Sequence, residues 1–181
     1  MTRIFIVSPK SGKLRTAEEW KKEGGENVKK AEYIVIVPDD GSHPFLIPKR
    51  TLGEFPWKKA CEEAEGFFKG DEEGNVVKGF KLPTRKQFID IRDARSCGLD
   101  QVLELIGGDQ LLKDFRNGEW FWTSEGWIPA GTSAEDWSSS RCSTYYAWFS
   151  YGNGGYASVN YVYSTGLALP LLLYDFREAN V

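Results

Sequence analysis

The feature that most restricts how this chain can fold is a long stretch, from Cys142 to Tyr174, that contains no charged residue. A membrane-spanning helix needs about 20 consecutive apolar residues, whereas glycine, serine and asparagine interrupt this stretch throughout. Bulky residues separated by such turn formers are typical of short strands joined by turns. Besides the final Tyr174, six tyrosines fall here, which are Tyr145, Tyr146, Tyr151, Tyr156, Tyr161 and Tyr163. Tyrosine mixed with serine, glycine and asparagine is the composition of antibody-like binding loops.

The first half of the chain predicts a strand, a charged segment, a hairpin and helices. The β-branched run Arg3–Val7 predicts an initial strand, and Tyr33–Val37 predicts a second. Because Pro38 and the turn Asp39-Asp40-Gly41 end this second strand, Pro44–Pro48 is expected to return beside it as a hairpin. Apolar residues at helical spacing, together with the N-cap Thr84, predict helices at Ala17–Lys22, within Phe55–Phe68, after Thr84 and at Leu99–Ile106.

Strand patterns dominate from Trp120 onward. They predict strands at Trp120–Ser124, Trp137–Arg141, Ala147–Tyr151, Tyr156–Tyr163 and Leu167–Leu173. Helices and strands are segregated along the chain rather than alternating as βαβ units, which indicates an α+β fold. We expect one domain over residues 31–176, preceded by an N-terminal strand and charged segment at residues 1–30.

Charge and cysteine content exclude several classes of protein. The net charge of −3 and the isoelectric point near 5.4 do not favour nucleic-acid binding, which depends on clustered Lys and Arg. The three cysteines, Cys61, Cys97 and Cys142, are widely spaced and form no CxxC pair, so neither a disulfide framework nor a zinc site is indicated, although one bridge stays open. The apolar run near the N-terminus is too short for a signal peptide, and no membrane insertion is expected.

Several short motifs follow one another in a fixed order. They are Leu82-Pro83-Thr84-Arg85-Lys86-Gln87-Phe88, Trp120-Phe121-Trp122-Thr123-Ser124, Trp137-Ser138-Ser139-Ser140, Ala147-Trp148, Gly152-Asn153-Gly154-Gly155 and the closing Leu167–Leu173. In this order they resemble bacterial and phage domains of C-type lectin-like fold, related to the formylglycine-generating-enzyme superfamily and to the domain family of unknown function numbered 1566. The resemblance covers residues 30 to 174 and implies an N-terminal hairpin, two or three helices and a C-terminal, tryptophan-rich antiparallel sheet. The closing strand departs from many relatives, which carry Arg or Lys there.

Within that superfamily the chain resembles the variable proteins of diversity-generating retroelements. An adenine-mutagenised repeat gives those proteins variable Tyr, Ser, Asp and Gly positions near their C-terminus. The resemblance implies a non-catalytic protein that displays a diversified ligand surface, here within residues 142–166. The implied ligand-binding residues are Ser143, Tyr145, Tyr146, Tyr151, Tyr156, Ser158, Asn160, Tyr161 and Tyr163. The implied scaffold residues are Trp122, Trp137 and Trp148.

The resemblance also implies where such a protein acts. Its partner would be a protein or a glycan on another cell or virion, and the chain itself would belong to a phage virion or a bacterial cell surface. A homo-oligomer, or docking into a larger assembly through residues 1–30, is compatible with this. One alternative is a structural component of a phage tail or surface appendage, and another is a degenerate enzyme of the formylglycine-generating type.

Catalysis, metals and cofactors find little support in the sequence. A copper site of the formylglycine-generating type needs paired cysteines, and Cys142 has no other cysteine near it in the sequence. The single histidine, His43, is predicted to be a surface turn residue, since one imidazole cannot supply a metal triad. Several acidic residues could in principle serve as catalytic acids for hydrolysis or as calcium ligands, and we interpret them as solvated charges. They are Glu62, Glu63, Asp71, Glu72, Glu73, Glu125, Glu135 and Asp136. Asn153 would be a further calcium ligand, but the calcium motifs of sugar-binding lectins are missing. We therefore expect no cofactor and no enzymatic activity.

Overall fold

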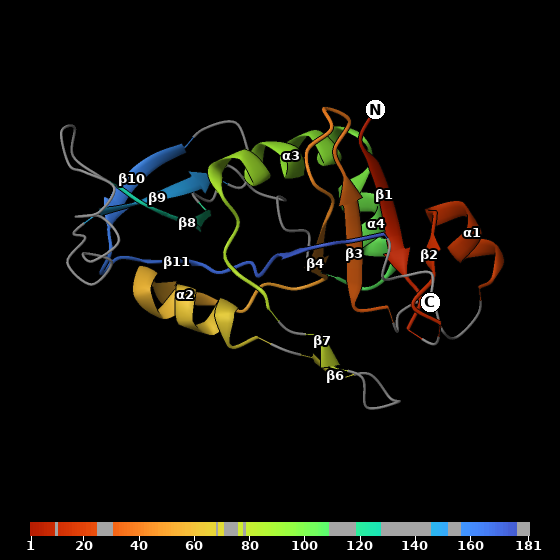
Figure 1. Cartoon of the computed structure of the whole chain (residues 1–181), viewed down its shortest axis with the longest axis horizontal. Coiled ribbons are helices and arrows are strands. Elements are labelled where there is room, and N and C mark those ends of the chain that lie inside the picture. The colour runs from red at the N-terminus through yellow and green to blue at the C-terminus, as the bar shows by residue number, and fades with distance from the viewer. Residues whose placement is uncertain are drawn as a thin grey trace.

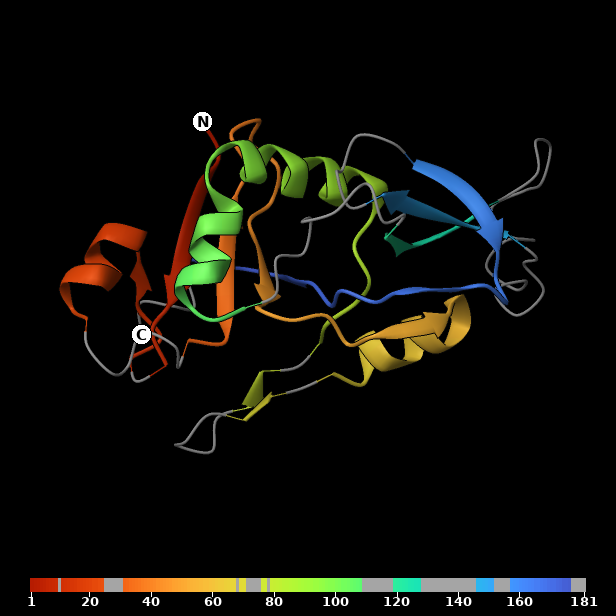
Figure 2. The same cartoon turned by 180° about the vertical axis from the view of Figure 1, so that it is seen from behind.

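Two five-stranded sheets form the framework of the molecule and lie toward opposite ends of its long axis (Figure 1). The computed structural model describes residues 1–9, 11–24, 31–67, 69–70, 76–77, 79–108, 119–127, 146–151 and 157–176. The view from behind shows helices above and below the segments that connect the two sheets (Figure 2).

The first sheet has the strand order β12–β4–β3–β1–β2. Its strands are β1 (Arg3–Val7), β2 (Leu14–Arg15), β3 (Tyr33–Val37), β4 (Phe45–Pro48) and β12 (Leu172–Leu173). The predicted hairpin is confirmed, because β3 and β4 pair antiparallel with Ile34 opposite Ile47. The predicted N-terminal strand is confirmed too, and β1 lies inside the sheet, between β3 and β2. The start of the chain therefore shares a sheet with the hairpin.

The second sheet has the order β10–β9–β8–β11–β5. Its strands are β5 (Glu54–Pro56), β8 (Trp120–Gly126), β9 (Tyr146–Tyr151), β10 (Ala157–Tyr161) and β11 (Thr165–Leu167). All pairings are antiparallel except that between β11 and β8. A two-stranded ribbon of β6 (Lys69–Gly70) and β7 (Val76–Val77) forms a third, small sheet. Together with the helices, these antiparallel-rich sheets confirm the expected α+β class.

The described residues contain four helices, which are α1 (Ala17–Lys22), α2 (Trp57–Glu65), α3 (Arg85–Ser96) and α4 (Leu99–Leu105). Thr84 caps α3 as predicted: its hydroxyl accepts from the backbone N–H of Gln87, and the Gln87 side chain accepts from the backbone N–H of Thr84. Trp57, at the start of α2, is buried, and its indole N–H donates to the carbonyl of Thr123 in β8 at 2.9 Å. Helices α2 and α3 thus lie against different sides of the second sheet (Figure 1).

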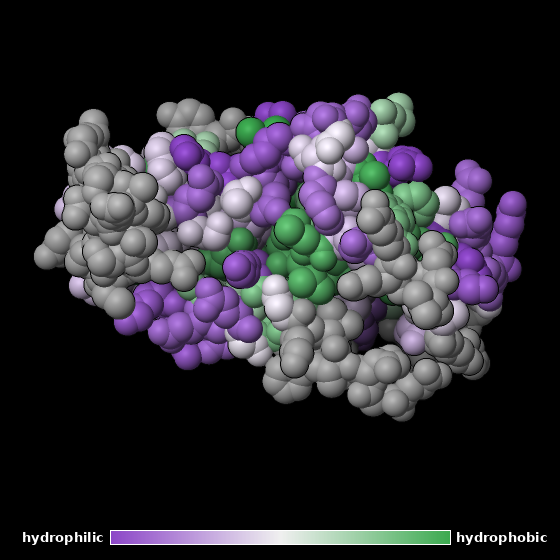
Figure 3. Space-filling model, viewed as in Figure 1, coloured by the Kyte–Doolittle hydropathy of each residue, from purple (hydrophilic) through white to green (hydrophobic). Residues whose placement is uncertain are grey.

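Helix α3 joins the two sheets into one core. Its residues Phe88 and Ile91 belong to the same buried cluster as Ile34 of β3 and Phe121 of β8. The rings of Phe88 and Phe121 are 5.8 Å apart. On the surface seen in Figure 3, a hydrophobic area lies near the middle of the long axis, with hydrophilic side chains above it and to its left. The core is therefore continuous from one sheet to the other.

The prediction of one continuous strand over Leu167–Leu173 was wrong, because the structure divides this segment between the two sheets as β11 and β12. Between them, Ala168 exchanges backbone hydrogen bonds with Leu52 and Gly53, and Leu171 exchanges them with Lys81. Pro170 stands between these contacts and cannot donate to a ladder. The apolar run reflects a crossing through the core, where Ala168, Leu169 and Leu171 are buried.

The predicted strand Trp137–Arg141 lies outside the described residues. Among the residues that are described, no helix is long and apolar enough to cross a membrane.

Candidate functional site

Strands β9 and β10 form a ladder that divides their side chains between two faces. The register places Tyr161 opposite Tyr146 and Val159 opposite Trp148. Because successive side chains of a strand alternate, these four residues share one face of the sheet. The other face holds Ala147, Phe149, Tyr151, Ser158 and Asn160.

Three aromatic rings form a row on the first of these faces. The ring of Tyr146 lies 4.6 Å from that of Tyr161 and 5.6 Å from that of Trp127, measured between centroids. Tyr161 is 54% exposed and Trp127 is 37% exposed, so the two outer rings of the row reach solvent. Trp148 follows Tyr146 by two residues on the same side of β9. We call Trp127, Tyr146, Trp148 and Tyr161 the aromatic face.

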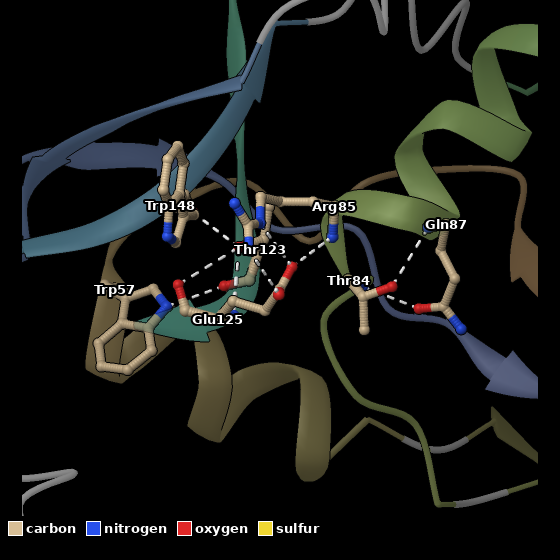
Figure 4. A network of polar contacts seen from close by, with 7 residues as sticks. All are labelled: Trp57, Thr84, Arg85, Gln87, Thr123, Glu125 and Trp148. Atoms are coloured by element: carbon tan, nitrogen blue, oxygen red, sulfur yellow. Dashed lines mark hydrogen bonds and ion pairs between the residues drawn. The ribbon is translucent and has the colours of Figure 1, made fainter. Parts of the chain in front are cut away.

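Arg85, the first residue of α3, covers Trp148. Its guanidinium carbon is 4.2 Å from the ring centroid, within the range of a cation–π interaction. Glu125 of β8 holds this arginine (Figure 4): its Oε2 accepts from the backbone N–H of Arg85 at 2.7 Å and from Nε at 3.2 Å. The same carboxylate lies at the N-terminus of α3, where the helix dipole favours negative charge. Arg85 and Glu125 therefore balance each other's charge beside the aromatic face.

An irregularity near the end of β8 aims Glu125 at α3. The hydroxyl of Thr123 donates to the carbonyl of Trp148 at 2.8 Å and accepts from the backbone N–H of Glu125 at 3.1 Å (Figure 4). The backbone N–H of Ser124 then donates to the carbonyl of Pro83 at 2.8 Å. Bulges of this kind often re-aim a side chain next to a functional site. Here the bulge fixes helix α3, Arg85 and Trp148 relative to one another.

Tyr146 of the aromatic face has a raised pKa. A hydrogen bond between the Tyr146 and Tyr161 hydroxyls raises the pKa of Tyr146 above the ordinary value for tyrosine, and desolvation adds to this. A raised pKa keeps the phenol protonated, so it acts as a hydrogen-bond donor and acceptor rather than as an anion. The face offers apolar rings with neutral polar edges.

The predicted ligand-binding residues divide between the two faces of the sheet. Tyr146 and Tyr161 lie on the aromatic face, whereas Tyr151, Ser158 and Asn160 lie on the face toward α2. Tyr151 is half-buried and packs against the cluster that contains Trp57 and Trp122. Alternation along Tyr156–Tyr163 already separates Ser158 and Asn160 from Tyr161 in the sequence, whereas the sides on which Tyr146 and Tyr151 join them depend on the register of β9 with β10.

Asn160 lies near the end of β10, and Tyr163 lies in the turn that follows. The side-chain oxygen of Asn160 accepts from the backbone N–H of Tyr161 at 2.8 Å and from the hydroxyl of Ser164 at 3.4 Å. Tyr163 is 77% exposed at the tip of the turn. Asn160 therefore has a structural partner, while the ring of Tyr163 extends into solvent.

Three more of the predicted ligand-binding residues, Ser143, Tyr145 and Tyr156, lie outside the described ranges. The predicted scaffold residue Trp137 also lies outside them. The scaffold residue Trp122 is completely buried, and its indole N–H donates to the carbonyl of Phe55 at 2.9 Å. Trp148 is only half-buried, because Arg85 rather than the core covers one side of its ring.

Three residues of the site were not predicted from the sequence, namely Trp127, Arg85 and Glu125. The interpretation of Glu125 as a solvated loop charge was wrong, because it lies in β8 and pairs with Arg85. A local signal existed for Arg85, which directly follows the N-cap of a predicted helix. Nothing in the sequence connects Trp127 to Tyr146, because that contact depends on the pairing of β8 with β9.

Other candidate chemistry is not gathered into a site in the described part of the chain. His43 is exposed as predicted, with Nδ1 2.8 Å from the carbonyl oxygen of Pro44. Glu63 pairs with Lys59 on the surface of α2 at 2.7 Å. Within the described ranges there is no group of three His, Cys, Asp or Glu residues that could hold a metal ion, and Cys97 is a free thiol. The other acidic candidates, Asp71, Glu72, Glu73, Glu135 and Asp136, fall outside these ranges, as do Asn153 and Cys142.

Comparison with models of known protein families gave no match for this chain. Comparison with curated proteins gave no match either.

Proposed function

We propose that this protein binds a ligand without catalysis, and that the aromatic face is its contact surface. The observation that carries the proposal is the row Trp127–Tyr146–Tyr161, whose outer rings are exposed on a rigid sheet. Tryptophan, tyrosine and arginine contribute a large share of the binding energy at protein interfaces, because they bury much area at low entropic cost. A sheet packed on helices from both sides holds these rings in fixed positions before a ligand arrives.

Binding is favoured over catalysis by the chemistry of the site. General acid–base or nucleophilic catalysis needs a group whose pKa is tuned for proton transfer near neutral pH. Among the described residues, the ionisable groups at the aromatic face are Arg85 and Glu125, which pair with each other, and the tyrosines, of which Tyr146 has a raised pKa. These features support recognition by ring contact and neutral hydrogen bonds.

We also propose that the scaffold of this surface is a C-type lectin-like fold and that a retroelement diversifies its display region. Two features support this. The Leu82–Phe88 motif caps α3 and buries Leu82 and Phe88, which is a scaffold role. The tyrosines Tyr146 and Tyr161, in the segment that resembles a variable region, lie on a face that reaches solvent. The partner would be a protein or glycan on another cell or virion, and the protein would be carried on a phage particle or bacterial surface.

A binding screen tests the contact surface directly. The purified chain is applied to a glycan microarray and to an array of bacterial surface proteins, beside the double variant Trp127→Ala/Tyr161→Ala. We expect the wild type to bind at least one immobilised probe and the double variant to lose about tenfold or more in affinity, since each lost aromatic anchor costs on the order of 1 kcal/mol or more.

Leu173→Ala is the matched control for this screen. Leu173 is also an exposed apolar residue, 55% accessible, but it lies in β12 of the first sheet, so its removal should leave binding unchanged. Equal binding by the wild type and the double variant, with both folded, would overturn the assignment of the aromatic face.

Sequencing the 3′ region of this gene across its native population tests the diversification separately. We expect substitutions concentrated in codons 142–166, including those of Tyr146 and Tyr161, with the codons for Trp122 and Trp148 constant. Tyr151, which packs on the core side, should vary less than Tyr161 because a substitution there disturbs packing. A uniform sequence over this region would remove the retroelement origin and leave a fixed binding module.

A further inference from the structure

Strand β10 is an outer strand of the second sheet and has an open edge. Among the strands that the structure describes, β10 pairs only with β9. An edge strand presents backbone N–H and C=O groups that can pair with another chain. This raises the question of which groups of β10 point outward and what they can bind.

The hydrogen bonds of β9 determine which groups of β10 point outward. In an antiparallel ladder the N–H and C=O of one residue point to the same side. The carbonyl of Trp148 accepts from the Thr123 hydroxyl in β8, so Trp148 directs its backbone groups toward β8 and away from β10. The opposed residue, Val159, must then direct its own groups to the open edge. The same alternation turns Ala157 and Tyr161 outward.

The backbone groups of Tyr161 already have hydrogen-bond partners, whereas those of Ala157 and Val159 have none among the residues that the structure describes. The N–H of Tyr161 donates to the Asn160 side chain at 2.8 Å, and its carbonyl accepts from the N–H of Ser164 at 2.9 Å. Within the part of the chain that the structure describes, nothing bonds to the outward groups of Ala157 and Val159. Two donors and two acceptors over this three-residue span therefore have no partner among the described residues.

The other edge strands of both sheets carry features that discourage pairing, and β10 does not. Strand β2 contains Arg15, β5 contains Glu54 and Pro56, and β12 is only two residues long. Charge, proline and short length are the usual means by which proteins protect sheet edges. The five residues of β10, Ala-Ser-Val-Asn-Tyr, include neither a charge nor a proline. Among the edge strands of the two described five-stranded sheets, β10 is therefore the one that carries no feature against pairing.

We propose that β10 pairs antiparallel with β10 of a second copy of this chain, about a two-fold axis at Ser158. In this register Ala157 of each copy lies opposite Val159 of the other, so the four open groups of one strand meet the four of its partner in four backbone hydrogen bonds. The pairing leaves the groups of Tyr161 with the partners they already have. Ala157 and Ser158 are small, and no like charges meet across the axis, which suits a strand that must approach its own copy.

This pairing would join the two second sheets into one continuous sheet. The aromatic faces of both copies would then lie on the same side of it, with Val159 and Ala157 at the centre, so a partner with repeated features would meet two contact surfaces at once. The inference goes beyond the proposed function, because dimerisation can be measured without any ligand. Interfaces built on one short strand pair are small, so we expect a reversible dimer with a dissociation constant of roughly 10 µM to 1 mM.

Sedimentation equilibrium over that concentration range tests the proposal with the full chain alone. The wild type should show a concentration-dependent dimer. Val159→Pro removes an outward N–H but no bond to β9, and proline is tolerated on edge strands. It should therefore fold and raise the dissociation constant at least about tenfold, since two of the four intermolecular bonds are lost.

A charge exchange at the axis gives a second, independent readout. Ser158→Lys and Ser158→Glu should each be monomeric, because like charges would meet across the axis, whereas an equimolar mixture of the two should dimerise again. Leu173→Lys, a charge on an exposed position of β12, should dimerise like the wild type. A wild type that stays monomeric at roughly 1 mM, or a dimer that persists in Val159→Pro and in Ser158→Lys, would overturn the proposal. A monomer that instead binds an extended peptide along β10 would also overturn it.

Discussion

At the scale of single residues, Gly166 shows how tightly the second sheet is packed around its tryptophans. It pairs with Phe55 of β5, and an added Cβ would lie only 2.7 Å from Cε3 and Cη2 of Trp120. We predict that Gly166→Ala lowers the free energy of unfolding by about 1–3 kcal/mol, the usual cost of forcing extra volume into a packed core. Urea unfolding followed by circular dichroism measures this loss.

A double-mutant cycle checks the cause of that loss. In a Trp120→Leu background the six-membered ring that meets the new methyl group is gone, so the further cost of Gly166→Ala should fall close to zero. If the cost stays the same in both backgrounds, backbone conformation rather than contact with Trp120 is responsible.

Tyr33 carries a polar atom that the fold leaves without a partner. Its ring is stacked near Phe80, and its buried hydroxyl has no hydrogen-bond partner among the described residues. Burial, aided by the charge of Glu32, raises the pKa of Tyr33 to about 12. Because an unpaired buried hydroxyl is costly, we predict that Tyr33→Phe leaves stability at pH 7 unchanged or raises it by about 1 kcal/mol.

The raised pKa of Tyr33 also predicts the sign of a pH effect. The unfolded chain releases this proton near pH 10, whereas the folded chain keeps it until about pH 12. The contribution of the group to stability is therefore complete below about pH 10 and is lost as the pH rises to 12. Urea unfolding at pH 11 should favour Tyr33→Phe over the wild type by about 1 kcal/mol more than at pH 7. A difference that does not change with pH would contradict the assignment.

At the scale of elements, the N-terminus of α3 supports the site as well as the helix. Thr84 and Gln87 form a capping box. Arg85, which directly follows Thr84, binds Glu125 and covers Trp148. We predict that Thr84→Ala lowers the free energy of unfolding by about 1 kcal/mol, the typical value for an N-cap. The same variant should weaken ligand binding on the aromatic face, because Arg85 loses its fixed position.

Thr16→Ala is the matched control for this prediction, since Thr16 and Glu19 form the same capping box on α1. Helix α1 is six residues long and buries only Trp20, and no element of the second sheet depends on it. We expect a smaller loss of stability than for Thr84→Ala and no change in binding. If the two variants had equal effects on binding, ligand binding on the aromatic face would not depend on the cap of α3.

Local patterns in the sequence were sufficient for most elements but not for the way they assemble. The β-branched run at Tyr33–Val37 and the helical spacing after Thr84 each depend on neighbours in sequence, and both were predicted. The split of Leu167–Leu173 was not, because an apolar run looks the same in one strand and in a segment that crosses the core. Only its partners, Gly53 and Lys81, distinguish the two.

The candidate site was predictable in composition but not in geometry. The tyrosine-rich strands were found because their composition is unusual. Which tyrosines share a face depends on the register of β9 with β10, and a shift by one residue exchanges the two faces. Trp127, Arg85 and Glu125 were missed for the same reason. Trp127 follows β8, Glu125 lies in β8 and Arg85 begins α3, so each meets the residues of β9 only through contacts between segments far apart in the sequence.

At the scale of the whole molecule, the two sheets should unfold together because they share a core. Phe121 of β8 is 1% exposed and belongs to the same cluster as Ile34 and Ile36 of β3, with Phe88 of α3 between the sheets. We predict one cooperative transition in which tryptophan fluorescence, dominated by the second sheet, coincides with far-ultraviolet circular dichroism. Phe121→Ala should lower the free energy of unfolding by about 3–5 kcal/mol and shift both signals together.

The control for this prediction is Leu173→Ala, an exposed position whose loss should change stability by less than about 0.5 kcal/mol. If Phe121→Ala displaced only the fluorescence transition, the second sheet would be a separate cooperative unit. The aromatic face would then open without disturbing the first sheet. Coincident transitions would mean instead that rings on the aromatic face draw their rigidity from packing at the opposite end of the molecule. In that case a substitution deep in the first sheet, such as Ile36→Ala, should weaken ligand binding only by lowering the folded fraction, and it should leave the affinity of the folded molecules unchanged.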